Sequence, residues 1–245
     1  MYIDFSSLFH VASKDLTGKG TVYISPDDSL WPKEWKTVYY KNYANLPTIP
    51  LERERPTADY FDLLYQRQSC RTFSGRPVQK EMLSTLLLYS CGILNRKEDI
   101  VSTRAYPSGG GRFPLEVYPV VFSGSESVPS GIYHYNVKDH ALDVLWQRPF
   151  SPQDIKDLFV YEWVQDASLL LVITAVFWRN QIKYGERGYR YIVLEAGHLG
   201  ENVYLTAGAL GLRCCAMGGS FDEKIECLLD IDGTTESLIH SVVLG

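Results

Sequence analysis

The sequence predicts a protein of the α+β or α/β class with a mixed sheet, because helix-like and strand-like segments alternate along the chain. Two further observations support this class. Residues 131–146 read as a hairpin of two strands in which apolar and polar residues alternate. Residues 189–212 read as one long helix that is apolar on most faces. With 245 residues, the chain is long enough to bury a sizeable core.

The first 58 residues carry few signals of regular structure. Prolines at positions 26, 32, 47, 50 and 56 interrupt each candidate helix, and aromatic residues are scattered among them. A segment of this kind seldom forms a core alone. We therefore expect residues 1–58 to be an irregular extension that wraps over the main domain or over a partner subunit. The main domain is expected to span residues 59–245.

The first half of the main domain predicts two helices followed by three strands. Apolar residues at helical spacing indicate helices over 58–69 and 79–94, with a turn between them. After a glycine-rich loop, residues 115–123 read as a buried strand. Residues 131–136 and 141–146 then form the two strands of the hairpin, joined by Val-Lys-Asp-His.

The second half begins with a short helix over 151–159, in which Ser151 is the expected N-cap and Pro152 the first helical residue. A central strand over 168–177 follows. The remaining short elements are a strand within 213–219, a helix over 225–231 and a final strand over 237–245. Small residues recur at three- and four-residue spacings in the long helix, which indicates close contact with another helix in the core or at a dimer axis.

Composition excludes several classes of function. The net charge of −5 gives no basic field for nucleic acid or for an anionic membrane. The longest apolar run is too short to span a membrane, and no signal-peptide pattern opens the sequence. The five cysteines include no CxxC pair, so neither a disulfide framework nor a metal site is expected. A cytoplasmic location is the simplest interpretation.

Three segments carry residues that could perform chemistry. In the first, Arg67-Gln68-Ser69-Cys70-Arg71, two guanidinium groups and a hydroxyl could bind a phosphate, although a solvated helix end is the simpler alternative. The second is Pro107-Ser108-Gly109-Gly110-Gly111-Arg112. Its bare backbone could approach a ring or a phosphate, but it could also be a plain turn.

The third segment runs from Arg179 to Tyr191 and places three cations at four-residue spacing, on one face if the segment is helical. Lys183 and Tyr184 are adjacent within it. We expect burial beside other cations to lower the pKa of both groups, which would make either one a usable base or acid. A solvated basic loop is the alternative.

Together, and in this order, the segments resemble the FMN-dependent nitroreductase superfamily, and more closely its SagB-type dehydrogenases, which include azoline oxidases. The family motif RxSxR matches Arg67, Ser69 and Arg71. Three longer motifs match Pro107–Tyr118, Lys183–Tyr191 and Leu194–Leu205, and the shorter ones match Gly131–Tyr135 and Gly218–Asp222. The resemblance is firm over about residues 60–245 and loose over 1–59.

The resemblance implies a homodimer with a mixed, mainly antiparallel sheet flanked by helices, a long buried central helix, and FMN at the subunit interface. It assigns the phosphate and ribityl chain to Arg67, Gln68, Ser69 and Arg71. It brings Pro107, Ser108, Gly109 and Gly110 to the flavin, from the neighbouring subunit. It also places Met217, Gly218 and Gly219 near flavin N5, and it makes Lys183 and Tyr184 the catalytic pair.

Two positions depart from the family pattern. Nitroreductases usually add basic phosphate ligands just beyond the last strand, whereas this sequence ends at Leu244-Gly245. We expect either that other arginines replace those ligands or that FMN is held less tightly. Arg112 stands where the family more often has an apolar residue, and it either compensates for those ligands or faces water.

The activity expected from the resemblance is the oxidation of azolines or similar peptide-derived or amino-acid-derived substrates, by base-assisted hydride transfer to flavin. Possible partners are a small-molecule or peptide substrate and other subunits of a peptide-modifying complex. Two alternatives remain open. One is an NAD(P)H-dependent reductase of nitro, quinone or unsaturated compounds, and the other is a non-catalytic subunit of a biosynthetic complex.

Overall fold

The computed structural model of the chain describes residues 5–14, 24–95 and 103–245. Its helices are α1 (Phe5–Ala12), α2 (Lys33–Lys36), α3 (Tyr60–Gln66), α4 (Lys80–Cys91), α5 (Pro152–Lys156), α6 (Trp178–Tyr184), α7 (Arg187–Ala209) and α8 (Asp222–Leu229). Its strands are β1 (Thr48–Pro50), β2 (Ile93–Asn95), β3 (Thr103–Arg104), β4 (Leu115–Val121), β5 (Gly131–Asn136), β6 (Ala141–Gln147), β7 (Leu169–Val176), β8 (Cys214–Ala216) and β9 (Glu236–Leu244). Short 3-10 helices cover Asp28–Leu30 (η1), Gly109–Gly111 (η2) and Glu162–Asp166 (η3).

Seven strands form one sheet in the order β1-β6-β5-β4-β7-β9-β8, and β2 and β3 form a separate pair. Among the described residues, each of these strand pairs is antiparallel, and one isolated parallel bridge joins Val78 to Gly124. The α+β class with a mainly antiparallel sheet flanked by helices is therefore confirmed. The predicted hairpin is β5 and β6, with the expected partners Asn136 and Ala141 at its turn.

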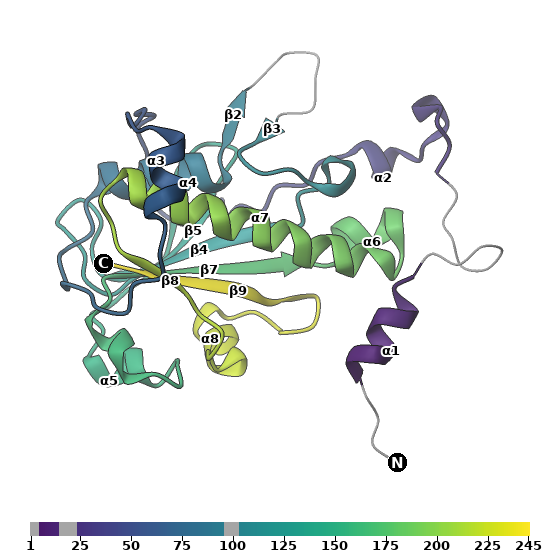
Figure 1. Ribbon diagram of the computed structural model, residues 1–245. Coiled ribbons are helices and arrows are strands. Elements are labelled where there is room, and N and C mark those ends of the chain that lie inside the picture. The colour runs from purple at the N-terminus through teal and green to yellow at the C-terminus, as the bar shows by residue number, and fades with distance from the viewer. Residues whose placement is uncertain (1–4, 15–23, 96–102) are drawn as a thin grey trace.

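The sheet separates two hydrophobic clusters, because alternate residues of a strand point to opposite faces. Leu171 and Ile173 of β7 belong to the cluster between the sheet and helices α4 and α7, whereas Leu170 and Val172 belong to the cluster between the sheet and helices α5 and α8. Figure 1 shows α4 and α7 above the sheet and α5 and α8 below it. The predicted strand over 168–177 is thus the central β7, buried on both faces.

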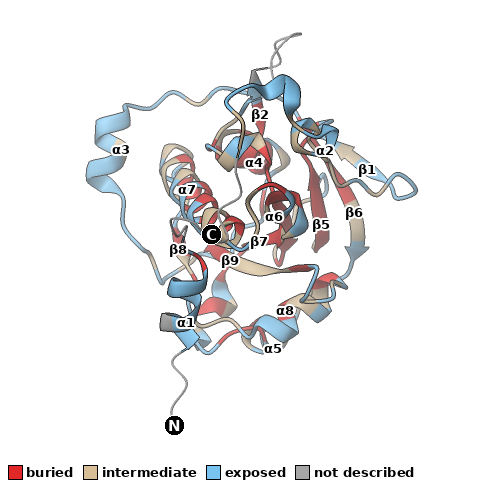
Figure 2. Ribbon diagram, turned by 90° about the vertical axis from the view of Figure 1, so that its right-hand side faces the viewer, coloured by how far each residue is buried: buried red, intermediate tan, exposed pale blue. Residues whose placement is uncertain are grey.

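The long helix was predicted over 189–212 and is observed over Arg187–Ala209. One face is buried in the core, with Ile192, Ala196 and Leu199 almost inaccessible to solvent, and Figure 2 shows buried, intermediate and exposed residues along the same helix. The opposite face is open, because Leu194 is 56% exposed and a Cβ added at Gly197 would meet nothing within 4 Å. The sequence predicted that this helix is buried on most faces, but within one chain only one face of α7 is buried.

Several boundaries differ from those predicted, each for a local reason. The helix expected over 79–94 is α4, which ends at Cys91 because the chain continues from Gly92 into β2. The basic segment after β7 is helical, but Gly185 breaks it at φ 53° into α6 and α7. The helix expected over 225–231 is α8, which starts at Asp222 and closes at Asp230 in a left-handed conformation.

Residues before 59 contain regular elements that the sequence did not predict. Their contacts with the rest of the chain are polar as well as apolar. Strand β1 pairs with the edge strand β6, and the Val144 N–H donates to the Pro47 carbonyl at 2.8 Å. The Lys41 ammonium lies 2.6 Å from a carboxylate oxygen of Glu236. The described part of this segment therefore packs along the main domain of its own chain.

A buried chain of charged groups links the sheet to α6. Arg179, at the start of α6, pairs with the Glu116 carboxylate of β4. The other Glu116 oxygen lies 2.9 Å from Nε2 of His134, and Nδ1 of His134 lies 3.0 Å from the Asp143 carboxylate. Burial opposes the charged form of Glu116, but His134 and Arg179 outweigh it and lower the pKa of Glu116 to about 2. These contacts fix α6 relative to the sheet.

Replacing Glu116 with alanine is expected to lower the free energy of unfolding by about 3–5 kcal/mol, because it leaves the buried Arg179 and His134 without their shared partner. Urea titration of the wild type and variant measures the difference. The matched control is Glu223→Ala on the exposed surface of α8, expected to change stability by less than about 0.5 kcal/mol. A loss below about 1 kcal/mol for Glu116→Ala would contradict the structural role of this network.

Candidate active site

The glycine-rich loop and the Lys183-Tyr184 pair, which are far apart in the sequence, meet in space. Gly110 lies in the left-handed region at φ 63°. A Cβ built at Gly110 would stand 2.3 Å from the Tyr184 hydroxyl oxygen and 3.1 Å from Lys183 Nζ. Both the conformation and the space at this position therefore require glycine. Two of the three segments singled out in the sequence are therefore in contact.

Glu195 of α7 holds this loop, although sequence reasoning gave the residue no role. Its carboxylate accepts a hydrogen bond of 2.9 Å from the Gly109 N–H, and its other oxygen is buried with no hydrogen-bond partner among the described residues. Burial raises the pKa of Glu195 to about 7. The available signal was a glutamate in the apolar run Val193-Leu194-Glu195-Ala196, because a buried charge in such a helix needs a partner.

Lys183 and Tyr184 have different electrostatic surroundings. Lys183 is buried, and both burial and the nearby Arg112 guanidinium lower its pKa. Burial raises the pKa of Tyr184, and the neighbouring Tyr191 raises it further. The expectation that both pKa values fall is correct for Lys183 and wrong for Tyr184, because burial disfavours the charged form of either group. Lys183 is thus disposed to lose a proton, and Tyr184 to keep its own.

Arg112 is buried, which excludes the prediction that it faces water. Its Nε donates to the Arg179 carbonyl at 2.9 Å, and its Nη1 donates to the Trp35 carbonyl at 2.7 Å. The guanidinium therefore joins α6 to the segment that contains α2. Its positive charge also acts on Lys183.

The segment Arg67–Arg71 lies in a different place, beside the C-terminal half of α7. Ser69 Oγ lies 2.9 Å from the Tyr204 hydroxyl, and the Arg67 guanidinium stands 5.4 Å from the centre of the same ring. The Tyr204 hydroxyl also accepts from the Ala216 N–H of β8. The side chains of Arg67, Gln68, Ser69 and Arg71 are exposed. One tyrosine thus ties the predicted phosphate segment to the edge of the sheet.

A cavity of about 220 Å³ opens beside this segment, with Arg67, Gln68, Cys70 and Arg213 in its wall. Within the described part of the chain, its lining includes no carboxylate. The cavity is therefore electropositive, which suits an anion such as a phosphate group. Arg213 was not among the predicted site residues, because it is distant from Arg67 in the sequence and the two residues line the same cavity only in the folded chain.

The predicted residues Met217, Gly218 and Gly219 follow β8 directly. Met217 is buried, whereas a Cβ added at Gly218 would meet nothing within 4 Å. At Gly219 the ring of Tyr161 lies 2.7 Å from such a Cβ. The Tyr161 ring stacks on Trp163 at 5.7 Å. This short stretch therefore presents bare backbone at Gly218 and is flanked by aromatic rings at Gly219.

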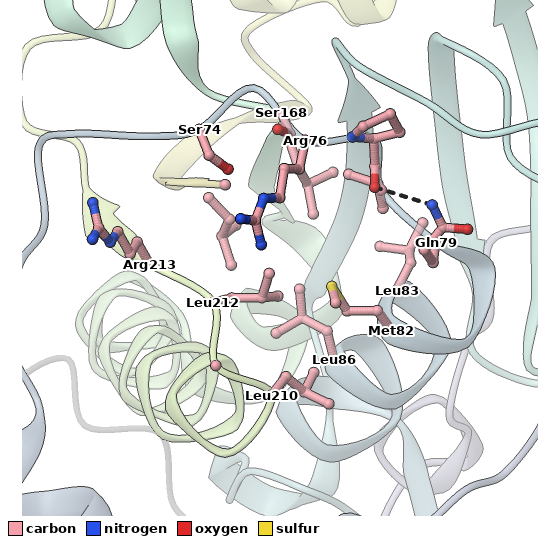
Figure 3. Close-up of a pocket in the computed structure, with 16 residues that line it drawn as sticks. Ser74, Arg76, Gln79, Met82, Leu83, Leu86, Ser168, Leu210, Leu212 and Arg213 are labelled. Carbon is pink, nitrogen blue, oxygen red and sulfur yellow. Dashed lines mark hydrogen bonds between the residues drawn. The ribbon is translucent and has the colours of Figure 1, made fainter.

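A larger cavity of about 650 Å³ adjoins the first one and shares Gly211, Leu212 and Arg213 with it. Figure 3 shows Arg76 pointing into it from one side, with Met82, Leu86 and Leu212 below. Neither cavity is lined by the glycine loop or by Lys183. The two cavities are therefore separate from the place where Lys183 and Tyr184 meet the glycine loop.

One chain does not bring the two halves of the predicted site together. The glycine loop contacts α7 at Tyr191 and Glu195, whereas Ser69 and Arg67 contact it at Tyr204. Tyr191 and Tyr204 are thirteen residues apart, which is about 20 Å along a helix at about 1.5 Å per residue. Figure 1 shows α6 toward one end of α7 and α3 toward the other. Pro107 and Ser108 lie with the loop, where Ser108 Oγ accepts from the Phe113 N–H.

The raised pKa of Glu195 predicts that the free energy of unfolding falls as pH rises from about 4.5 to about 7. Folded Glu195 keeps its proton up to about pH 7, whereas in the unfolded chain it loses the proton near pH 4.5, so its contribution to stability is lost as pH rises between these values. Glu195→Gln keeps an acceptor for the Gly109 N–H and cannot ionise. From pH 5 to pH 8, wild type should lose about 2–3 kcal/mol relative to Glu195→Gln in urea titrations. Parallel curves for the two proteins would refute the assignment.

Comparison with known proteins places this geometry in a family. Among the described residues, no helix is long and apolar enough to cross a lipid bilayer. The chain is 29% identical over 170 residues to MJ1384 of Methanocaldococcus jannaschii, which bears a nitroreductase name, and the match covers 69% of this chain and 83% of that protein. It is 29% identical over 141 residues to the microcin B17-processing protein McbC of Escherichia coli, covering 54% and 50% of the two chains.

The fold agrees with these sequence matches. A nitroreductase structure from Anabaena variabilis superposes with a TM-score of 0.72 at 29% identity, and the superposition covers 99% of this chain and 46% of the other. The chain thus spans about half the length of two of these three proteins. The sequence model of the nitroreductase family matches residues 64–245, which include the glycine loop, Lys183-Tyr184 and the Arg67–Arg71 segment. The chain belongs to the nitroreductase family.

Proposed function

We propose that this chain is an FMN-dependent oxidoreductase of the SagB type that oxidises azoline rings or similar groups in a peptide substrate. The observation that carries the proposal is the contact of Lys183 and Tyr184 with Gly110, because it sets a candidate base and a candidate acid against a loop of bare backbone. The similarity to McbC, which is named a microcin B17-processing protein, supports a peptide substrate.

The residues present fit FMN in three respects. The cavity beside Arg67 and Gln68 is lined by cationic and neutral groups and suits the phosphate. The open backbone at Gly218, at the end of β8, leaves room for a flat ring close to the chain. Ser69 lies near β8, because its Oγ and the Ala216 N–H both contact the Tyr204 hydroxyl, and Arg67 and Arg71 are exposed. FMN, when bound, supplies the two-electron acceptor that the oxidation requires.

We further propose that the site is completed by a second copy of the chain. The cavity of about 220 Å³ is smaller than the roughly 300–1,000 Å³ of ligand pockets that enclose a whole cofactor. The glycine loop contacts α7 at Tyr191 and Glu195, about 14–20 Å along the helix from Tyr204. A partner that packs on the open face of α7, around Leu194 and Gly197, could bring its own glycine loop to the phosphate segment.

In the proposed reaction, the neutral amine of Lys183 removes a proton from the carbon next to a carbonyl group of the substrate. Its lowered pKa increases the fraction of neutral amine at a given pH. The Tyr184 hydroxyl, whose pKa is raised, stays protonated and donates a hydrogen bond to the carbonyl oxygen on which negative charge develops. Arg112 stays charged beside the pair and favours loss of the Lys183 proton.

Replacing Lys183 with alanine is expected to reduce turnover about 100-fold or more, because the base is lost while the flavin segments are untouched. The assay is the loss of two hydrogens from a synthetic thiazoline-containing peptide, followed by mass spectrometry with FMN-reconstituted protein. In wild type, the rate should rise with pH to a midpoint below the ordinary lysine pKa of about 10.4.

The control for this experiment is the visible flavin spectrum, which should be the same in wild type and Lys183→Ala. Full turnover by a flavin-loaded Lys183→Ala protein would disprove the base assignment. Oxidation of NAD(P)H with a nitro or quinone acceptor, and none of the thiazoline peptide, would instead favour the reductase alternative.

A mixing experiment tests whether two subunits share the site. One variant carries Arg67→Ala and Arg71→Ala, the other Lys183→Ala, and each alone should be inactive. After unfolding and joint refolding, half of the dimers are mixed, and each of these has one intact site. About a quarter of wild-type activity should therefore return. No recovery, in a sample that is dimeric by light scattering, would mean that each site lies within one chain.

A further inference from the structure

The Lys183 side chain ends among three aromatic rings, two of which belong to the segment before residue 59. Its Nζ lies 3.5 Å from the ring centre of Trp31, 5.9 Å from that of Trp35 and 5.5 Å from that of Tyr184. A cation within about 6 Å of a ring centre is attracted to the ring face, most strongly to that of tryptophan. Lys183 is only 1% exposed. The indole of Trp31 is therefore the closest aromatic cover of this amine.

Residues 25–36, called the roof below, hold Trp31 in this place through hydrogen bonds of their own. The Trp31 indole N–H donates to the Ser25 carbonyl at 2.7 Å. Between these two residues, Asp27 caps the turn η1 by accepting from the Ser29 N–H. The Trp31 ring also meets the Trp35 ring edge-to-face at 6.4 Å. The roof is thus folded locally and is more than a strand of chain lying across the surface.

Three contacts fasten the roof to α6, the helix that carries Lys183. The Trp35 indole N–H donates to the carbonyl of Ile182, the residue before Lys183, at 3.1 Å. From below, Arg112 donates to the Trp35 carbonyl and to the Arg179 carbonyl. Helix α2 of the roof contacts α6. Arg112, at a position where the family more often has an apolar residue, therefore connects the roof to α6.

We propose that the roof is part of the active site and that Trp31 is the residue that positions the Lys183 amine and shields it from water. Two groups approach the amine closely: the centre of the Trp31 ring lies 3.5 Å from Nζ, and a Cβ at Gly110 would come within 3.1 Å of it. A substrate therefore reaches Lys183 only when Trp31 moves aside. The catalytic meaning of this arrangement rests on the proposed function, but the shielding of the amine does not.

The test measures how fast acetic anhydride acetylates Lys183 in the full-length, FMN-reconstituted protein, with peptide mass spectrometry as the readout. Lys33 and Lys36 of the roof are exposed and serve as internal standards. Trp31→Ala should raise the rate at Lys183 relative to these standards by about tenfold or more. Trp31→Phe, which keeps a ring, should stay within about threefold of wild type. The matched control is Leu30→Ala, since Leu30 is 71% exposed and adjacent to Trp31 in the sequence. This variant should leave the acetylation rate of Lys183 unchanged.

An unchanged rate at Lys183 in Trp31→Ala, or a rise equally large in Leu30→Ala, would overturn the proposal. If Trp31→Ala is not folded by circular dichroism, Trp31→Leu decides in its place, with the same expected direction. Turnover of the thiazoline peptide separates this inference from the proposed function. Full activity of a flavin-loaded Lys183→Ala protein would disprove the role of Lys183 as a base but would not affect the acetylation result. An unchanged acetylation rate of Lys183 in Trp31→Ala would disprove the shielding by Trp31 but would not affect the role of Lys183 as a base.

Discussion

The position of α6 depends on one continuous path of polar contacts that begins and ends in the segment before residue 59. It runs from the Trp35 carbonyl through Arg112 to the backbone of Arg179, and from the Arg179 side chain through Glu116 and His134 to Asp143, which accepts from the Tyr43 N–H. Most of these groups are buried, so each requires its neighbour, and a missing partner would leave an uncompensated charge. The path therefore fixes α6 more narrowly than apolar packing could, because dispersion contacts are individually weak and non-directional.

Such a fixed helix matters for the chemistry proposed here. A base contributes only when its nitrogen is held within hydrogen-bonding reach of the proton that it removes. Lys183 is one helical turn beyond Arg179 in the same helix. The hydrogen bonds and ion pairs that hold Arg179 therefore also fix the position of the Lys183 backbone relative to the sheet. The glycine loop is fixed to the same region by Glu195. Lys183, the glycine loop and the roof are thus attached to the same part of the structure, which would limit the entropy lost when a substrate binds.

The sequence was sufficient for the elements whose periodicity is strong and local. The hairpin β5–β6, the buried β7 and the long α7 lie within a few residues of their predicted bounds, because alternation and helical spacing report directly on one buried face. The site was predictable only as a set of motifs. That Arg112 is buried, that Glu195 holds Gly109 and that Trp31 covers Lys183 all depend on contacts between residues tens of positions apart. Local pattern carries no record of such pairs, and the opposite pKa shifts of Lys183 and Tyr184 follow from burial that the pattern alone did not specify.

The long helix α7 sets the last constraint. A continuous α-helix of 23 residues cannot fold back to bring its two halves together, so the helix positions of Glu195 and Tyr204, nine residues apart, stay about 14 Å apart in any one chain. The open face of the same helix carries Leu194 and Gly197, where a second helix could approach closely. Under two-fold symmetry, a partner helix running in the opposite direction would bring its glycine-loop end toward the Tyr204 end of the first. The feature that separates the two half-sites within a chain is therefore also the one that can unite them between chains.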